Sequence, residues 1–277
     1  MNPETFETFK KYIETNLGIK MPAAKKVMLE TRLGRRLRAL KIPSYEEYCD
    51  FVFSKEGYAG GEIQQLIDAV TTNETDFFRE PQHYDFLTNR VLPELVIDRG
   101  IDEINVWSVA ASTGQEAYTL AMVLSDFART KHRFNFQILG TDISSAVLEV
   151  AQTGIYTDRQ TQKIPPFLKK AYCLRSRNKS DNTIRLKPEV RGKIMFRQLN
   201  LMDSSYPLKK KYHIIFCRNV FIYFDKPTQR KVLERIYEHM APEGYLFMGH
   251  SENIADVNLP LKNVSSAVYK NTAQVNR

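Results

Sequence analysis

The sequence predicts an α/β fold that opens with a nucleotide-binding unit, and three features of residues 104–124 support this. A short apolar run over residues 104–107 leads into small residues from Ser108 to Gly114. An amphipathic segment follows, because apolar residues recur at helical spacing; they are Ala117, Leu120, Ala121 and Leu124. A strand, a tight loop and a helix in this order open nucleotide-binding α/β domains.

The loop between this strand and helix has two interpretations. Small residues let a ligand approach the main chain, and the helix N-terminus offers free N–H groups. The loop is not GxGxxG, because Gly114 is its only glycine. The local pattern therefore fits either a cofactor loop or an ordinary strand-to-helix turn.

Composition narrows the class of protein. The 277 residues have room for one large or two modest domains, and their apolar and charged fractions are typical of a soluble globular protein. We find no apolar run as long as a membrane span and no signal-peptide core, and three widely separated cysteines fit a reducing cytoplasm. The five histidines show no ligand spacing such as HExxH, so we expect no metal.

The net charge of +8 is unevenly placed. Residues 20–41 hold eight Lys or Arg and one acid, and residues 163–197 hold eleven Lys or Arg and two acids. The remainder of the chain is therefore acidic. Two basic patches indicate an acidic partner, which could be nucleic acid, an anionic membrane surface or an acidic protein face. The alternative is two solvated basic faces.

Residues 1–70 predict a small domain of four helices. The first ends before Gly18, the second carries an apolar stripe from Leu29 to Leu40, Ser44 caps the third, and residues 62–70 form the fourth. On the second helix, Arg32, Arg35 and Arg38 share one flank. Arg36 lies close to the apolar stripe of that helix and would have to snorkel.

Residues 71–80, TTNETDFFRE, separate this domain from the rest of the chain. Threonine and asparagine cap helices and bind ligand hydroxyls, while Phe77 and Phe78 could anchor the segment to a core. On this pattern alone the segment fits a capped linker between domains.

From residue 82 onward the pattern becomes α/β. We expect a helix over 83–95, strands over 103–107 and 134–139, and a helix that Ser144 caps and Gly154 ends. Asp142 follows the second strand, where Rossmann-type folds bind ribose hydroxyls. Its position fits a helix N-cap equally well.

The C-terminal half predicts a small inserted sheet and the end of the main sheet. Short strands at 172–174, 183–186 and 194–196 suggest an antiparallel excursion. A buried strand over 212–217 precedes a helix that begins at Asp225, runs to Met240 and stops at the turn 242–244. Strands at 245–248 and 267–269 complete the pattern.

Six motifs in family order span nearly the whole chain, and together they resemble the CheR family of chemotaxis receptor methyltransferases. They are NETDFFRE (73–80), VWSVAASTGQEAYTLAM (106–122), LGTDIS (139–144), NL (200–201), IIFCRNVFIYFD (214–225) and GYLFMGHSEN (244–253). The resemblance implies an S-adenosylmethionine-dependent enzyme that methylates glutamate side chains of transmembrane chemoreceptors. It also implies a helical domain over 1–70, a Rossmann-like domain over 71–277, and an inserted β-subdomain over about 165–198 that contacts the receptor.

The resemblance further implies which residues contact the cofactor: Asn73, Thr75, Arg79, Glu116, Asp142, Asn200, Leu201, Cys217, Arg218 and Asn219. In the family pattern Arg79 lies near the methionine carboxylate, Glu116 can meet the methionine ammonium, and Asp142 binds the ribose. Asn200 and Leu201 match the adenine side. Arg79 and Tyr223 are the expected catalytic residues. From the residues alone, Cys217 fits a buried strand residue that contributes only its backbone, and Tyr223 fits the core.

The implied chemistry needs little machinery. A sulfonium makes its methyl group electrophilic, and a glutamate carboxylate is already ionised at neutral pH. We therefore expect in-line transfer with no general base, no covalent intermediate and no metal, and the enzyme has to align the reacting groups.

Docking is the remaining expectation. Receptor methylation helices are acidic, so we expect Arg32, Arg35 and Arg38 to contact them, with residues 163–197 as the competing surface. The turn at 175–182 lacks the glycine of relatives that bind a receptor pentapeptide, so such tethering is doubtful. Gln115 and Ala117 also depart from the glutamate and proline of many relatives. We expect a monomer in the cytoplasm without membrane insertion.

Two other functions remain for comparison. A methyltransferase acting on DNA bases would usually carry (D/N)PP(Y/F), but this chain has RNVF at 218–221, and we expect no nucleic-acid partner. A non-enzymatic protein that senses the cofactor would keep the same binding residues. Labelled S-adenosylmethionine separates the three, because label would enter receptor, nucleic acid or neither.

Overall fold

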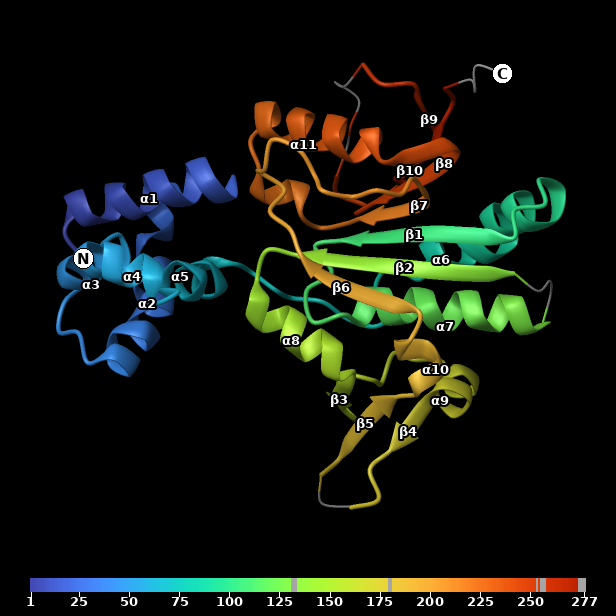
Figure 1. The fold of residues 1–277 in the computed structure, drawn as a ribbon, viewed down its shortest axis with the longest axis horizontal. Helices are drawn as coiled ribbons and strands as arrows, with labels where there is room; N and C mark the ends of the chain where they lie inside the picture. Colours follow the sequence, from blue (N-terminus) through green and yellow to red (C-terminus); the bar gives the residue numbers. More distant parts are fainter. Residues whose placement is uncertain (131–133, 179–180, 253, 255–257, 274–277) are drawn as a thin grey trace.

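The computed structural model describes residues 1–277 except 131–133, 179–180, 253, 255–257 and 274–277. It confirms a helical N-terminal domain followed by a Rossmann-like α/β domain (Figure 1). Within the described residues, we find no helix long and apolar enough to cross a membrane.

The N-terminal domain contains the four expected helices and one more. They are α1 (Pro3–Leu17), α2 (Lys26–Leu40), α3 (Tyr45–Val52), α4 (Lys55–Ala59) and α5 (Glu62–Val70), with a 3₁₀ turn η1 (Ala23–Lys25) before α2. Gly18 ends α1 with a φ of 69°, which favours glycine. Ser44 caps α3 as predicted, because its hydroxyl accepts a hydrogen bond from the Glu47 N–H. The unexpected α4 has the same kind of cap at Ser54.

The α/β domain is built on a seven-stranded sheet in the order β6-β2-β1-β7-β8-β10-β9. Its strands are β1 (Glu103–Val109), β2 (Asn135–Asp142), β6 (Ile194–Gln198), β7 (Tyr212–Cys217), β8 (Met240–Met248), β9 (Leu261–Ser265) and β10 (Val268–Asn271). The first five strands in this order are parallel, and β10 and β9 add antiparallel pairings. The chain leaves β1 toward β2 and β6, and then returns to the other side of β1 at β7.

Helices cover both faces of the sheet. The side chains of Val106 and Phe216 pack on one face with α7 (Gln115–Thr130) and with the helical run α6 (Gln82–Phe86), η2 (Leu87–Val91) and η3 (Pro93–Asp98). Trp107 and Ile215 pack on the other face against α11 (Lys226–Glu238). Since neighbouring strand residues point to opposite faces, this apolar run is buried on both sides. The helix α8 (Ser145–Thr153) contacts β2 and β6.

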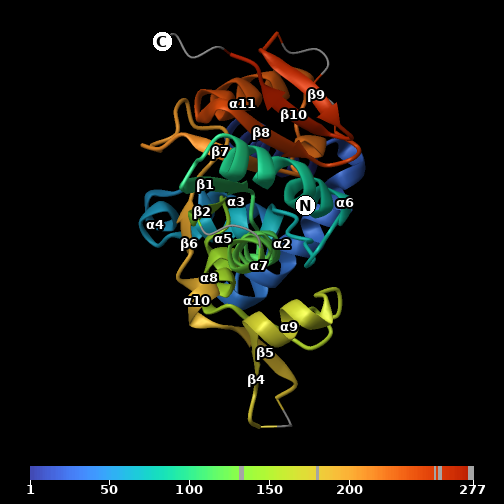
Figure 2. The same ribbon diagram turned by 90° about the vertical axis from the view of Figure 1, so that its right-hand side faces the viewer.

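The small antiparallel sheet differs from our expectation for residues 165–198. It consists of β3 (Ile155–Thr157), β4 (Cys173–Arg175) and β5 (Thr183–Leu186) in the order β3-β5-β4, together with α9 (Pro166–Tyr172) and α10 (Pro188–Arg191). The expected third strand, β6, instead pairs in parallel with β2 in the main sheet. There the Phe196 ring fills the space that a Cβ on Gly140 would occupy. Figures 1 and 2 both show the small sheet projecting away from the main one.

The boundary between α11 and β8 is the second correction. We expected helix to Met240 and a turn at 242–244, but α11 ends at Glu238 and β8 already begins at Met240. The turn-forming residues lie inside β8 as an irregularity, because the register passes from the pair Tyr212–Met240 to Ile214–Tyr245. A hydrogen bond from the Tyr212 N–H to the His239 carbonyl holds this early start. The sequence pattern also did not predict β9.

The carboxyl ends of β1 and β2 face the N-terminal domain (Figure 1). Hydrogen bonds across this junction include those from the Lys20 N–H to the Tyr223 carbonyl (3.0 Å), from Asn200 Nδ2 to the Asn16 carbonyl (2.8 Å), and from Gln64 Nε2 to the Ile143 carbonyl (3.2 Å). The carboxyl ends of β1 and β7, between which the strand order changes direction, lie at the same end of the sheet. Open α/β sheets bind ligands outside such a reversal, which makes the junction the place to look for a site.

Candidate active site at the domain junction

A cavity of about 290 Å³ lies at this junction. Its wall contains nearly all the residues predicted to bind or transform a cofactor: Asn73, Thr75, Arg79, Glu116, Asp142, Asn200, Leu201, Arg218, Asn219 and Tyr223. Cys217, the remaining predicted residue, has a fully buried side chain in the core on the α11 face. Burial raises the pKa of its thiol well above the usual value. Its side chain is therefore a core residue.

The loop after β1 forms the floor of the cavity. Ala110 and Ser112 have φ values of 54° and 50°, an unusual left-handed backbone for residues other than glycine. The Ser112 hydroxyl donates to the Asn73 carbonyl (2.8 Å), and Tyr156 donates to the Thr113 carbonyl (2.6 Å). A Cβ on Gly114 would come within 2.9 Å of Ala151, so α8 packs directly on the loop. These contacts favour the interpretation as a ligand loop over an ordinary turn, because strained backbone persists only where its surroundings hold it.

Backbone hydrogen bonds to both carboxylate oxygens hold Asp142 in position. Its Oδ2 accepts from the Ser112 N–H (2.8 Å), and its Oδ1 accepts from the Ser144 N–H (3.0 Å). Each oxygen keeps a further lone pair, because a carboxylate offers about four acceptor sites. Burial raises the pKa of Asp142, although the backbone donors oppose the shift. A nearly buried carboxylate with two free acceptor sites suits a pair of neighbouring hydroxyls. The N-cap of α8 is the Ser144 hydroxyl, so Asp142 is not needed for that role.

Arg218, in the cavity wall, forms ion pairs with two carboxylates. Its side chain is 2% exposed, with Nη1 3.2 Å from Glu116 Oε2 and Nη2 3.0 Å from Glu80 Oε2. Nη2 also donates to the Arg79 carbonyl (2.6 Å), and the guanidinium lies near the ring of Tyr84. Burial raises the pKa of Glu116, while Arg218 and the Ser108 hydroxyl favour its ionised form. Glu116 thus lines the cavity with a carboxylate whose negative charge is only partly neutralised by Arg218.

Residues 71–80 are more than a capped linker. Phe77 is fully buried with its ring edge against Tyr156 (5.0 Å between centroids), and the Phe78 N–H donates to the Thr119 hydroxyl (3.2 Å). Both contacts anchor the segment in the α/β domain. Arg79 lines the cavity, and its Nη1 donates to the Glu74 carbonyl (3.1 Å). The segment connects the two domains and also forms one wall of the cavity.

The remaining predicted residues lie where the two domains meet. Asn200 donates to the end of α1 and accepts from the Met202 N–H. Leu201 accepts from the Tyr206 hydroxyl through its carbonyl. Tyr223 ends the 3₁₀ turn η4 (Phe221–Tyr223), and its half-buried side chain contributes to the cavity wall rather than being sealed in the core.

The sequence reasoning missed two parts of the site. Glu252 is buried, and its carboxylate accepts from the N–H groups of Asn219, Phe221 and Gly249 at 2.8–2.9 Å, which holds the loop after β7. Its only signal was its place in the motif at 244–253. The N-terminal domain also supplies cavity wall, through residues such as Leu17 and Met28. No local pattern could have shown that second contribution.

The predicted arginine flank of α2 is divided in the structure. Arg35 and Arg38 are exposed. Arg32 instead donates to the carbonyls of Val70 and Thr71 and to the Thr72 hydroxyl, and it lines the cavity. Arg36 does not snorkel to solvent but forms a two-pronged ion pair with Glu62 (2.9 and 2.7 Å).

Comparison with known families finds two matches that together span most of the chain. Residues 73–270 match the model described as CheR methyltransferase, SAM binding domain. Residues 4–71 match the model described as CheR methyltransferase, all-alpha domain. The border between the two matches coincides with the segment that forms the cavity wall.

Named relatives cover nearly the same length. A "Chemotaxis protein methyltransferase" of Borreliella burgdorferi is 36% identical over 94% of this chain and 91% of its own. "Chemotaxis protein methyltransferase 2" of Pseudomonas aeruginosa is 36% identical over 96% and 92%. The "Chemotaxis protein methyltransferase" of Escherichia coli K12 is 35% identical over 90% and 84%.

Proposed function

The chain belongs to the CheR methyltransferase family, and from this premise we propose that it methylates glutamate carboxylates of chemoreceptors. It is an S-adenosylmethionine-dependent methyltransferase. The observation that carries the proposal is the junction cavity, where a buried Asp142 with free acceptor sites faces the same space as Glu116 and Arg79. Each of these groups suits a different part of S-adenosylmethionine.

The residues fit this ligand in three places. Asp142 accepts from the ribose hydroxyls through its two free lone pairs. Glu116, whose charge is only partly compensated by Arg218, receives the methionine ammonium. Arg79 lines the cavity and receives the methionine carboxylate, because a guanidinium pairs with carboxylates through two parallel bonds. Asn200 and Leu201 also line the cavity, and we assign the adenine to them.

The chemistry follows from positioning. Bound S-adenosylmethionine supplies an electrophilic methyl group on its sulfonium. The glutamate of the receptor is ionised at neutral pH, so the chain has no proton to remove and needs no general base or metal for the transfer. Its task is to bring carboxylate, methyl and sulfur into line, which we assign to Arg79 and Tyr223 at the cavity wall.

Docking of the receptor is a separate part of the proposal. Arg35 and Arg38 lie exposed on α2, the helix that also supplies Met28 and Arg32 to the cavity wall. An acidic receptor helix lying along α2 would therefore have its glutamates near the cavity mouth. Arg32 serves a different purpose, because its guanidinium binds the chain between α5 and residue 72.

The test uses S-adenosylmethionine labelled in its methyl group, with membranes that contain chemoreceptors. Label should enter the receptor as a base-labile methyl ester. Label in nucleic acid, or in neither, would contradict the proposal.

Arg79→Ala should abolish most of this transfer while the fold stays intact. Arg90→Ala is a matched control, since Arg90 is exposed on η2 and lies outside the cavity wall. Activity of the Arg79 variant within about threefold of wild type corresponds to under ~0.7 kcal/mol of transition-state stabilisation. That result would return residues 71–80 to a linker role.

A further inference from the structure

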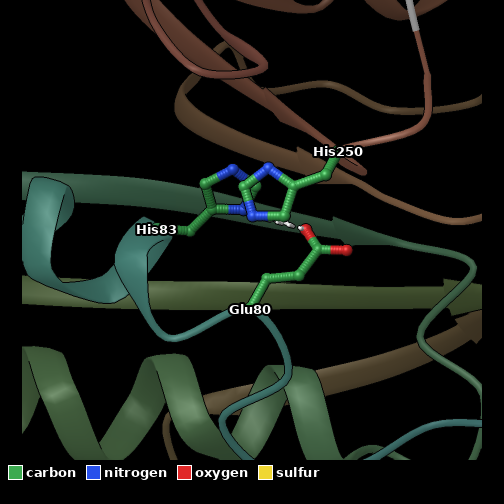
Figure 3. A group of neighbouring side chains, drawn as sticks. All are labelled: Glu80, His83 and His250. Atoms are coloured by element: carbon green, nitrogen blue, oxygen red, sulfur yellow. Dashed lines mark ion pairs between the residues drawn. The ribbon is translucent and has the colours of Figure 1, made fainter.

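A second cluster of chemistry-bearing side chains lies behind the cavity wall, outside the proposed cofactor contacts. Figure 3 shows the rings of His83 and His250 side by side, both turned toward one oxygen of Glu80. His83 Nδ1 is 3.5 Å from Glu80 Oε2, and His250 Nε2 is 3.7 Å from the same oxygen. One ligand atom from each residue lies within 4.8 Å of the other two.

The inner atoms of this cluster lack ordinary partners. The His83 side chain is 2% exposed, and its Nδ1 has no hydrogen-bond partner among the described residues. Glu80 Oε2 is also without one there, although Arg218 Nη2 lies 3.0 Å away as an ion pair. The two atoms lie 3.5 Å apart, so a buried ring nitrogen and a buried carboxylate oxygen face each other without a hydrogen bond between them.

The outer nitrogens of both rings are held by one residue. His83 Nε2 lies 3.3 Å from the Ser266 carbonyl, which can only accept, so Nε2 carries the hydrogen and Nδ1 offers its lone pair. His250 Nδ1 lies 3.4 Å from the Ser266 hydroxyl. Histidines that bind metals are usually held in this way, with the second ring nitrogen bonded to a carbonyl or another polar group.

We propose that Glu80, His83 and His250 form a binding site for a divalent transition metal of the zinc type. Two imidazoles and one carboxylate are an established ligand set for zinc with an open fourth position. Metal–ligand bonds of about 2.0–2.2 Å place tetrahedral ligands about 3.3 Å apart. The two histidine-to-carboxylate separations of 3.5 and 3.7 Å are close to this value, whereas the two histidine nitrogens, which lie within 4.8 Å of each other, have to approach further when a metal binds.

Two features of the surroundings bear on this site. Arg218 forms an ion pair with the Glu80 oxygen that would bind the metal, and this competition lowers the affinity for the metal. Glu116, however, lies 3.2 Å from the same guanidinium and balances its charge. The His250 side chain is 39% exposed, so a metal can enter from solvent on that side. The site is separate from the proposed methyl transfer, and its test does not depend on that function.

The chain positions of these residues explain why spacing suggested no metal. Glu80 and His83 precede the first strand, whereas His250 follows β8. HExxH-type reasoning examines only neighbours along the chain. The folded sheet brings the two segments together.

The experiment is titration of the metal-free, full 277-residue protein with Zn²⁺ alone, by calorimetry and equilibrium dialysis at pH 7.5. We expect one Zn²⁺ per chain. His250→Ala should weaken this binding at least tenfold, because even outer partners of metal ligands are worth 10–100-fold. His239→Gln is the control, since His239 packs on Trp107 outside the cluster, and it should bind within twofold of wild type.

Two results would overturn the proposal: the absence of a saturable single equivalent in the wild type, or undiminished binding in His250→Ala. Because His83 is buried, His83→Gln could fail to fold, and circular dichroism has to accompany it. The exposed His250 keeps the test decisive. Absorption of bound Co²⁺ gives an independent readout, which should show nitrogen ligation in the wild type and lose it in His250→Ala.

Discussion

Two arginine–carboxylate clusters, one in each domain, have a similar composition but differ in how fully their polar atoms are paired. In the helical domain, Arg36 binds both oxygens of Glu62, and the Tyr48 hydroxyl donates to the same carboxylate (2.9 Å). In the α/β domain, Arg218 lies between Glu80 and Glu116, and its Nε has no hydrogen-bond partner among the described residues. We call the first cluster closed, because none of its side-chain atoms is buried without a hydrogen-bond partner in the described part of the chain, whereas the second cluster contains such atoms.

The difference shows how the same ion pair serves two purposes. The cluster of Arg36 and Glu62 joins α2 to α5, and none of its atoms is among the buried side-chain atoms that lack a partner in the described part of the chain. A structural ion pair requires such compensation. The cluster of Arg218 borders the cavity, and Arg218 Nε, Glu80 Oε2 and His83 Nδ1 are buried without a hydrogen-bond partner among the described residues. An incompletely satisfied polar network is costly in the free protein, so it is best explained by what binds there.

The largest effect should come from Arg218→Met, which removes the cation between two buried carboxylates. Breaking a buried pair from one side costs about 3–5 kcal/mol of unfolding free energy. We also expect at least a 100-fold loss of methyl transfer, or about 2.7 kcal/mol. Without the cation the folded-state pKa values of Glu80 and Glu116 rise, so stability relative to wild type should recover as the pH falls. Urea unfolding at several pH values and the labelled assay measure these effects, and near-normal transfer would show that the cluster is only structural.

Asp142→Ala should weaken the binding of S-adenosylmethionine by ~1.5–3 kcal/mol, the range for hydrogen bonds to a charged group. Calorimetry on the folded variant measures this loss, and unchanged affinity would remove Asp142 from the site. Because burial raises the pKa of Asp142, wild-type affinity should decline as the pH falls through that raised value. The effect of Asp142 on the free energy of unfolding depends on pH in the other direction. The folded protein keeps the carboxyl proton to a higher pH than the unfolded chain does, so the stability that this protonation contributes is lost as the pH rises from the ordinary pKa of 3.8 through the raised one.

Arg36→Met should break the closed cluster with a different outcome. Arg36 is 24% exposed, so the loss should be smaller than for Arg218, about 1–3 kcal/mol of unfolding free energy for the carboxylate left behind. Cofactor affinity and methyl transfer per folded molecule should stay within twofold of wild type. A specific loss of transfer at full stability would mean that the two clusters do not differ in role.

The smallest effect should come from the exposed pair Arg35→Ala and Arg38→Ala, made together. Each solvent-exposed contact is worth at most ~1 kcal/mol, and their shared field acts on association rate. We expect a lower kcat/KM for receptor, a flatter salt dependence and unchanged cofactor affinity. Lys209→Ala with Lys262→Ala removes the same charge from the α/β domain and should leave receptor kinetics unchanged. If both double variants keep the wild-type salt slope, docking occurs on the β-subdomain or elsewhere.

The sequence alone determined the elements whose signals are local. The helix stop at Gly18, the caps at Ser44 and Ser144 and the helix start at Asp225 appear in the structure as predicted. Each depends on neighbours within about four residues, where backbone geometry and side-chain reach decide the outcome. The order of strand, loop and helix around Gly114 is of the same kind. The family motifs extended this to residues that line the junction cavity, because each motif is itself short and continuous.

Tertiary structure decided which of these elements meet. Nothing local distinguishes a strand such as β6 that joins β2 from one that joins the small sheet, because pairing depends on packing of residues such as Phe196 on Gly140. The same holds for the N-terminal wall of the cavity and for the meeting of His83 with His250. Periodicity and capping report the surroundings of a residue along the chain. Contacts between distant segments arise only when the sheet buries both faces and brings its carboxyl ends against the helical domain.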